Sequence, residues 1–242
     1  MRLQKFLAHS GVCSRRAAEK LILEGRVKVN DQKVIAMGEI VNPDSDTVLV
    51  DDKKVDFENK KLFLFHKPKG VVSTLSDPHN KKDLKQYVAL TKVRAFPVGR
   101  LDRDAFGLML LTNDGEFANK MLHPSFETER VYYLLVNGGI DQEDIKQAKL
   151  GLELRDGMAK ASLTNIKYDK SIEHLFDKPS LNQSLVRASL TEGRKHIVKR
   201  IMKNLGSPVI ELCRYSHGSF MLDKLRPGEI LEVENYEDSF PT

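Results

Sequence analysis

Residues 97–115 read PVGRLDRDAFGLMLLTNDG, and the interpretation of the whole chain starts from this stretch. The apolar run from Leu108 to Leu111 predicts a buried strand. Asn113-Asp114-Gly115 predicts a turn, and residues 116–122 predict a short helix that ends before a proline. Asp102 therefore lies in a loop that leads into a core strand.

The carboxylate of Asp102 stands between two arginines, Arg100 and Arg103. An acid in that setting is either a reactive group tuned by its neighbours or one member of a surface ion pair. Taken alone, these residues favour the ion pair, because exposed Asp–Arg pairs are common in proteins. The choice depends on what the rest of the chain contains.

Residues 1–58 predict a small domain of two helices followed by a sheet. Apolar residues recur at helical spacing from Leu3 to Leu7, and Gly11 is suited to end that helix. Ser14 is a suitable N-cap for a second helix that stops at Gly25. Short apolar alternations then predict strands at residues 27–29 and 48–50. The second helix is expected to turn four residues inward: Ala17, Ala18, Leu21 and Ile22.

Positive charge is concentrated in two parts of the chain. Residues 1–33 hold eight Lys or Arg against three acids, an excess that equals the net charge of +5 of all 242 residues. Residues 192–226 repeat the bias, again with eight basic residues against three acids. Two basic segments on a nearly balanced background indicate a polyanionic partner that is contacted at two places.

Composition argues against several classes of protein. The chain is 40% hydrophobic and 30% charged, which is ordinary for a soluble globular protein, and its length suits two domains. No apolar run approaches the roughly 20 residues of a membrane helix, so we expect a cytoplasmic protein with no membrane contact. The two cysteines are far apart and the histidines show no ligand spacing, so no metal site is expected.

Two further segments carry candidate site residues. In residues 127–136, ETERVYYLLV, strand alternation puts Arg130 and Tyr132 on one face and Tyr133 on the other. Tyr132 is then either a site residue or a core aromatic. Residues 192–206, EGRKHIVKRIMKNLG, predict a turn and a helix with Lys199 and Arg200 at opposite margins of its apolar face, which consists of Ile197, Val198, Ile201, Met202 and Leu205.

The N-terminal run RLQKFLAHSGVCSRRAAEKLILEGRVKVN (residues 2–30) resembles the S4 RNA-binding module. The resemblance covers roughly residues 1–58 and implies a rigid basic surface for structured RNA, where shape and phosphate contacts dominate. The module by itself implies binding and not catalysis. The implied RNA contacts are Arg2, Lys5, Arg15, Arg16, Lys20, Arg26 and Lys28.

The combination of GRLD with GLxLLTNDG resembles the catalytic motif of the pseudouridine synthases that carry an appended S4 module. The resemblance implies that Asp102 is the catalytic carboxylate and that Arg100 helps to displace the target nucleotide from its stack. The chain departs from the family at Ala105, where a threonine is common. HKPKG at residues 66–70 resembles the opening of the family's catalytic domain.

The resemblance also assigns roles to the two further segments. Arg130 and Tyr132 stand where the family has Lys-x-Tyr, which implies that Tyr132 stacks on the target base. A basic residue of the later helix is implied to pair with Asp102, and the pattern favours Arg200 over Lys199, while Val198 packs against the uracil. Two positions differ from the common residue, Ile197 replacing Gln and Ile201 replacing Met.

These interpretations predict an α+β protein with an S4-like domain at residues 1–58 and a catalytic domain at residues 59–242. The catalytic domain is expected to have a mostly antiparallel mixed sheet flanked by helices, and residues 165–182 a polar loop or partial helix. The expected activity is isomerisation of one uridine in ribosomal RNA or a ribosomal precursor particle, by a monomer without a cofactor. Two alternatives remain: a non-catalytic ribosome-associated RNA-binding protein, and a hydrolase of the glycosidic bond.

Overall fold

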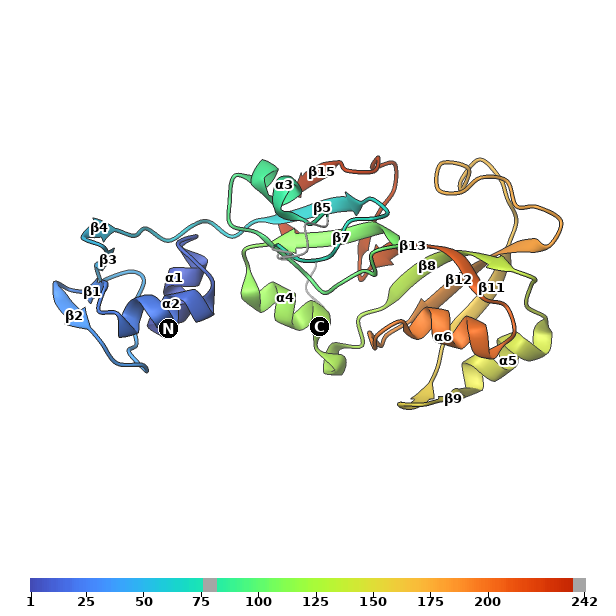
Figure 1. The fold of residues 1–242 in the computed structure, drawn as a ribbon, viewed down its shortest axis with the longest axis horizontal. Helices are drawn as coiled ribbons and strands as arrows, with labels where there is room; N and C mark the ends of the chain where they lie inside the picture. Colours follow the sequence, from blue (N-terminus) through green and yellow to red (C-terminus); the bar gives the residue numbers. More distant parts are fainter. Residues whose placement is uncertain (76–81, 237–242) are drawn as a thin grey trace.

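Two groups of helices and strands follow one another along the chain in the computed structural model, which describes residues 1–75 and 82–236 (Figure 1). The first group has its own core, built only from residues of the N-terminal segment. The second group contains the large sheet and two further cores, one on each face of that sheet. The extended segment from Val55 to Lys61 joins the two groups.

The N-terminal group packs two helices on a four-stranded sheet of order β2-β1-β3-β4. Ser14 caps the second helix by accepting a hydrogen bond from the Ala17 amide at 3.2 Å, as predicted. Ala18 and Ile22 are buried, whereas Ala17 is exposed, so the prediction that Ala17 faces inward is wrong. The elements are α1 (Leu3–His9), α2 (Arg15–Leu23), β1 (Val27–Val29), β2 (Gln32–Val34), β3 (Val48–Val50) and β4 (Lys53–Lys54).

The large sheet has the strand order β11-β12-β8-β13-β7-β5-β15. Neighbouring strands are antiparallel except β13 and β7, which are parallel, so the predicted mostly antiparallel mixed sheet is confirmed. Every residue of β7 is buried, because helices and loops cover both faces of the sheet at this strand. The seven strands are β5 (Leu62–Lys67), β7 (Phe106–Thr112), β8 (Arg130–Asn137), β11 (Ser162–Ile166), β12 (Gln183–Leu190), β13 (Val209–His217) and β15 (Ile230–Val233).

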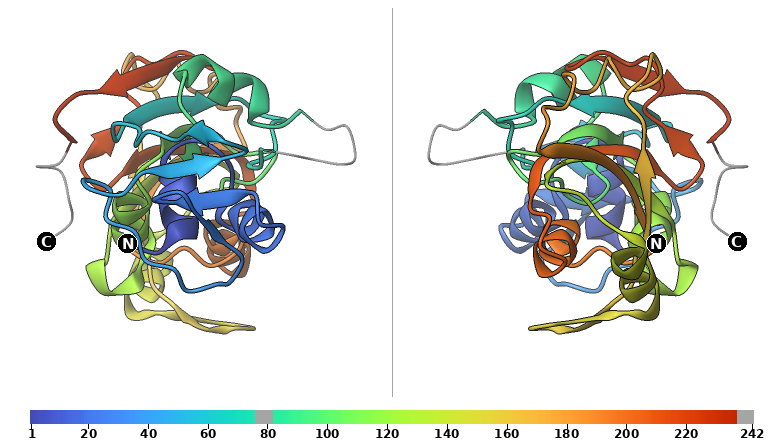
Figure 2. Two further views of the ribbon diagram at one scale, coloured as in Figure 1. Left: turned by 90° about the vertical axis from the view of Figure 1, so that its left-hand side faces the viewer. Right: turned by 90° about the vertical axis from the view of Figure 1, so that its right-hand side faces the viewer.

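Different helices cover the two faces of this sheet (Figures 1 and 2). One face packs against α6 and α5, and the other packs against α4. The remaining elements are α3 (Lys85–Val88), α4 (Gly115–Leu122), α5 (Gln142–Leu150), α6 (Ile197–Asn204), the short 3-10 helices η1 (Ala89–Thr91) and η2 (Pro124–Phe126), and the short strands β6 (Phe96–Pro97), β9 (Leu152–Leu154), β10 (Gly157–Ala159) and β14 (Phe220–Met221).

The segment from residue 165 to residue 182 differs in part from the prediction of a polar loop or partial helix. Its first two residues end β11, and the residues after Ile166 form turns and irregular backbone. Ile172, Leu175 and Phe176 are buried in the core on the α4 face, where the Phe176 ring lies 5.7 Å from the Phe106 ring. The segment is therefore a structural cover for the sheet.

Candidate active site

A pocket lies on the α6 face of the large sheet and brings together residues from four parts of the chain. The loop before β7, strand β8, strand β13 and the start of α6 all contribute to its wall. Most of the predicted site residues line it: Arg100, Asp102, Arg130, Tyr132, Val198 and Lys199. Arg200, the remaining predicted catalytic residue, is not part of the lining.

The loop that carries Asp102 is held by hydrogen bonds to its backbone. The Ser73 hydroxyl donates to the Leu101 carbonyl at 2.6 Å, and the Leu101 amide donates to the same hydroxyl at 3.1 Å. The ammonium group of Lys67, which is completely buried, donates to the Ala105 carbonyl at 2.7 Å. Burial lowers the pKa of Lys67 to about 8. Asp102 is thus presented on a loop that is fixed on both sides.

The carboxylate of Asp102 has two basic neighbours, both at the start of α6. Lys199 Nζ lies 3.4 Å from Asp102 Oδ2, and His196 Nε2 lies 3.2 Å from Oδ1. Lys199 also donates to both oxygens of Asp104, at 2.7 and 2.8 Å, and this hydrogen bond lowers the pKa of Asp104. Lys199 is therefore shared between Asp102, which lines the pocket, and Asp104, which does not.

Arg200 does not pair with Asp102, so the preference for Arg200 over Lys199 is wrong. Successive residues of an α-helix point about 100° apart, and Arg200 is turned toward the β9–β10 hairpin. There its guanidinium contacts Asp156 at 2.6 Å, and Arg194 binds the same carboxylate at 2.9 Å. Arg200 fixes the position of α6, while Lys199 faces the pocket.

His196 is a site residue that the sequence analysis missed. It is the N-cap residue of α6 and adopts a left-handed conformation with φ of 53°. This conformation is uncommon for a residue other than glycine. The only sequence signal was its position in the EGRKH turn, next to the predicted helix.

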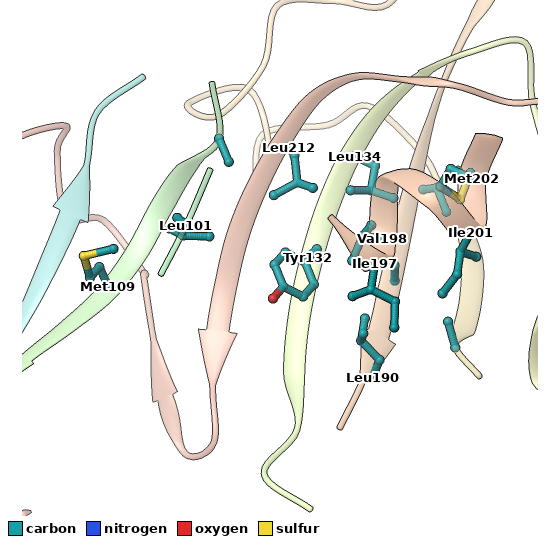
Figure 3. Close-up of a cluster of buried hydrophobic side chains, with 14 of the residues drawn as sticks. Leu101, Met109, Tyr132, Leu134, Leu190, Ile197, Val198, Ile201, Met202 and Leu212 are labelled. Atoms are coloured by element: carbon teal, nitrogen blue, oxygen red, sulfur yellow. The ribbon is translucent and has the colours of Figure 1, made fainter. Parts of the chain in front are cut away.

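Tyr132 belongs both to the hydrophobic core and to the pocket wall. Figure 3 shows its ring on β8, with Leu101 on one side and Ile197 and Val198 of α6 on the other. The side chain is 8% exposed. Tyr133 points to the opposite face, as predicted, and its ring lies 4.8 Å from that of Tyr215.

Two buried arginines lie beside Tyr132. Arg130 donates to three backbone carbonyls, the shortest bond being 2.7 Å to Thr191, so its guanidinium is held in place. Arg214 of β13 lies directly opposite Tyr132 in the register of β13 and β8. Its Nε donates a hydrogen bond to the Leu108 carbonyl at 2.7 Å. Its Nη2 is buried without a hydrogen bond to any described residue. Burial lowers the pKa of both guanidinium groups.

Arg214 was also missed by the sequence analysis. It stands in β13 together with other polar or charged residues, Glu211 and His217 among them, so no sequence pattern singled it out. No carboxylate of the described residues forms an ion pair with Arg130 or Arg214. The pocket therefore has a positively charged floor and one carboxylate, Asp102, at its mouth.

The predicted RNA-binding residues fall into two groups in the N-terminal domain. Arg2, Arg15 and Arg16 are exposed, with no ion pair among the described residues, and Lys20 lies 3.7 Å from Glu24. The other three are engaged by carboxylates: Lys5 by Glu116, Arg26 by Asp51 and Lys28 by Asp52. Arg100 is exposed at the mouth of the pocket.

Two kinds of feature are absent from residues 1–75 and 82–236. No three His, Cys, Asp or Glu side chains are grouped as metal ligands there. No described helix is both long enough and apolar enough to cross a bilayer.

Comparison with known proteins agrees with this geometry. Residues 61–204 match the model of the RNA pseudouridylate synthase family, and residues 1–46 match the S4 domain. An uncharacterised RNA pseudouridine synthase of Aquifex aeolicus is 41% identical over 98% of this chain and 92% of its own. Ribosomal large subunit pseudouridine synthase B of Bacillus subtilis is 38% identical over 98% of this chain and 93% of its own.

The fold agrees as well. A crystal structure of a pseudouridylate synthase covers 100% of both chains with a TM-score of 0.65 and 26% identity. The family match covers more than half of the chain and includes Asp102, Tyr132 and Lys199. The chain belongs to the RNA pseudouridylate synthase family, with an S4 domain at its N-terminus.

Proposed function

We propose that this enzyme isomerises one uridine of ribosomal RNA to pseudouridine, with Asp102 as the catalytic carboxylate. The observation that carries the proposal is the arrangement of three side chains around one pocket. Asp102 is held beside the Lys199 ammonium group, and the Tyr132 ring forms part of the wall. A purely binding protein has no need for a carboxylate in a cleft that receives an anionic ligand.

The reaction needs one carboxylate and one cation for its first step. The bond between N1 and C1′ breaks with its electron pair moving to N1, and Asp102 either bonds to C1′ or removes a ribose proton. The base then turns and C5 bonds to C1′; on the first route the bond between Asp102 and C1′ breaks, and on the second Asp102 returns the proton to the ribose. The C5 proton leaves and N1 takes up a proton. The product is an isomer of uridine, so no electrons are supplied or removed. The ammonium group of Lys199 lies 3.4 Å from this carboxylate and supplies the cation.

The remaining pocket residues suit an extruded uridine. Taking a nucleotide out of its stack costs a few kcal/mol, which contacts inside the pocket must offset. Tyr132 offers an aromatic surface to the base and Val198 an aliphatic one, while Arg100 at the mouth replaces the nucleotide in the stack. Arg130 and Arg214 line the pocket, and fixed positive charges in a site of low dielectric constant stabilise the negative charge of a detached base.

Ribosomal RNA is proposed as the substrate because of the S4 domain and the relatives' names. The Bacillus subtilis relative is named for the large ribosomal subunit. The exposed basic residues of the N-terminal domain, together with Arg100, extend the contact beyond the pocket. We further propose that the enzyme acts as a cytoplasmic monomer, on free ribosomal RNA or on a precursor particle, with its domains divided near residue 58.

Two measurements test the proposal. Pseudouridine is mapped in ribosomal RNA from cells with and without the gene, and one missing site is the expected result. The purified enzyme is then assayed on that RNA as wild type, Asp102→Asn and Asp104→Asn. Asp104 is the matched control, because it also contacts Lys199 but does not line the pocket. Asp102→Asn should lose all product while retaining RNA affinity, and Asp104→Asn should keep most of the activity.

The outcomes separate the alternatives. Unchanged ribosomal RNA in the deletion strain, with binding by the purified protein, supports a non-catalytic role. Release of free uracil from the RNA supports a hydrolase. Normal turnover by Asp102→Asn removes this carboxylate from the mechanism.

A further inference from the structure

Three residues at the end of β7 and directly after it contact the segment between the two domains and are not part of the active-site pocket. Thr112 donates through Oγ1 to the Lys61 carbonyl at 2.6 Å. Asn113 accepts from the Lys61 amide at 2.7 Å and donates to the Asn59 carbonyl at 2.9 Å. All three residues, including Asp114, are at least 95% buried. Their polar groups are therefore used to hold another part of the backbone.

Asp114 connects this contact to helix α4. One of its oxygens accepts hydrogen bonds from the Glu116 and Phe117 amides at 2.9 and 3.3 Å, which caps the helix. Its other oxygen lies 3.1 Å from the ammonium group of Lys60 in the linking segment. The same carboxylate thus orders both the helix and the linker.

The other end of the linker is fixed to the N-terminal domain. The Phe57 ring packs against Phe6 and His9 of α1, with ring centres 5.8 and 5.7 Å apart. Glu58 lies against Gly11, so close that an added Cβ there would be 2.2 Å from its carboxylate oxygen. In addition, Lys5 of α1 contacts Glu116 of α4 directly at 2.7 Å. The residues from 57 to 61 are therefore anchored at both ends.

An extended polar linker of this length would otherwise let the domains move independently. We propose that Thr112, Asn113 and Asp114 are positioning residues that fix the S4 domain relative to the pocket, and so help to determine which uridine of a bound RNA reaches Asp102. This inference rests on the proposed function, because it concerns delivery of the substrate to that site. A fixed distance between two binding surfaces favours RNA in which the two contact points have the matching separation.

The test compares Asn113→Ala with Asn165→Ala in the full-length protein. Asn165 is the control because its side chain also donates to a backbone carbonyl, that of Ile140 at 2.9 Å, but far from the linker. Each variant is assayed on a long ribosomal RNA transcript and on a short hairpin that carries only the target uridine and its stem. Small-angle X-ray scattering of each free protein measures the spread of distances between the domains.

Asn113→Ala should raise KM for the long transcript by roughly tenfold, leave kcat nearly unchanged and leave activity on the short hairpin within about twofold of wild type. Its scattering should show a broader distance distribution than wild type or Asn165→Ala. Equal KM values for the two variants on the long transcript, or an unchanged distance distribution in Asn113→Ala, would overturn the inference. A loss on both RNAs identifies a folding defect of the catalytic domain and also overturns it. If the wild type forms no pseudouridine, the proposed function fails, and the scattering still decides whether these residues fix the domains.

Discussion

At the scale of single residues, the choice between Lys199 and Arg200 shows how closely chemistry depends on side-chain direction. Both are basic neighbours on α6, but only Lys199 reaches the carboxylate of Asp102. Removing the cation next to the partly buried carboxylate of Asp102 is expected to cost more than removing one that fixes a helix from outside. The two roles can therefore be separated by matched substitutions.

Lys199→Met should lower kcat by about 100-fold or more, because the charged group beside Asp102 is lost. Arg200→Met should lower kcat by about tenfold or less, because it loosens α6 without changing the charge at Asp102. Single-turnover formation of pseudouridine measures both rates. Equal losses in the two variants would contradict the assignment of Lys199 as the partner.

Lys67 provides a test of stability against pH. Burial lowers its pKa to about 8 from the ordinary 10.5. Between these values the unfolded chain still holds a proton that the folded chain has released, so the free energy of unfolding rises with pH across this window. At 1.36 kcal/mol per pKa unit, the gain is about 3 kcal/mol.

The measurement is urea unfolding of wild type and Lys67→Met at several pH values from 7 to 10.5. The stability of the wild type relative to the variant should increase between about pH 8 and pH 10.5. Parallel curves for the two proteins would show that the ammonium group of Lys67 is not desolvated.

At the scale of elements, the β9–β10 hairpin fixes the helix that carries Lys199. Arg194 and Arg200 both bind Asp156 in this hairpin. Asp156→Ala should therefore lower kcat by about threefold to tenfold, through misplacement of Lys199, while RNA affinity stays near the wild-type value. Glu153→Ala, an exposed acid of the same hairpin, serves as the control and should have no effect on kcat.

The parallel pairing of β7 and β13 leaves no room for a side chain at one glycine of β7. Gly107 has φ of 104°, and a Cβ at this position would lie 2.4 Å from the Arg214 carbonyl oxygen. Gly107→Ala should lower the free energy of unfolding by about 3 kcal/mol or more, since the clash involves the backbone. Gly138→Ala shares a positive φ but has 3.7 Å of space, so it should cost about 1 kcal/mol. Thermal unfolding measures the stability of both variants. Similar losses for the two would show that the positive φ, and not the clash with the Arg214 carbonyl, is the cause.

The apolar periodicity of the sequence predicted α1, α2, β7, α4 and α6, because these elements bury a stripe or a continuous run against a core. The resemblance to the pseudouridine synthases, carried by three separate motifs, predicted that Asp102 and Tyr132 share one site, and both line the pocket, but it favoured Arg200 where Lys199 makes the contact. Arg214 and His196 could not be found in this way, since a single polar residue in a strand or turn leaves no periodic pattern. Whether Lys199 or Arg200 contacts Asp102 depends on where α6 lies in the folded protein. The periodicity of the sequence carries no information about that position.

At the scale of the whole molecule, the basic residues of the N-terminal domain differ in whether their charge is available for RNA. Arg15 and Arg16 are exposed without an ion pair among the described residues, whereas Arg26 is bound to Asp51. The double variant Arg15→Gln with Arg16→Gln should weaken RNA binding and reduce the slope of log affinity against log salt by about 1 to 2. Arg26→Gln should change the slope much less. Filter binding at several salt concentrations measures this, and equal slopes for both variants would contradict the division into available and engaged residues.

The position of β13 in the sheet has a consequence for the protein's synthesis. This strand lies between β7, which follows the Asp102 loop, and β8, which carries Tyr132. While the chain is still being translated, the two halves of the active site have no common neighbour until residues 209–217 have left the ribosome. The pocket is therefore completed only when β13 joins the sheet, and we expect the nascent chain to be inactive until then.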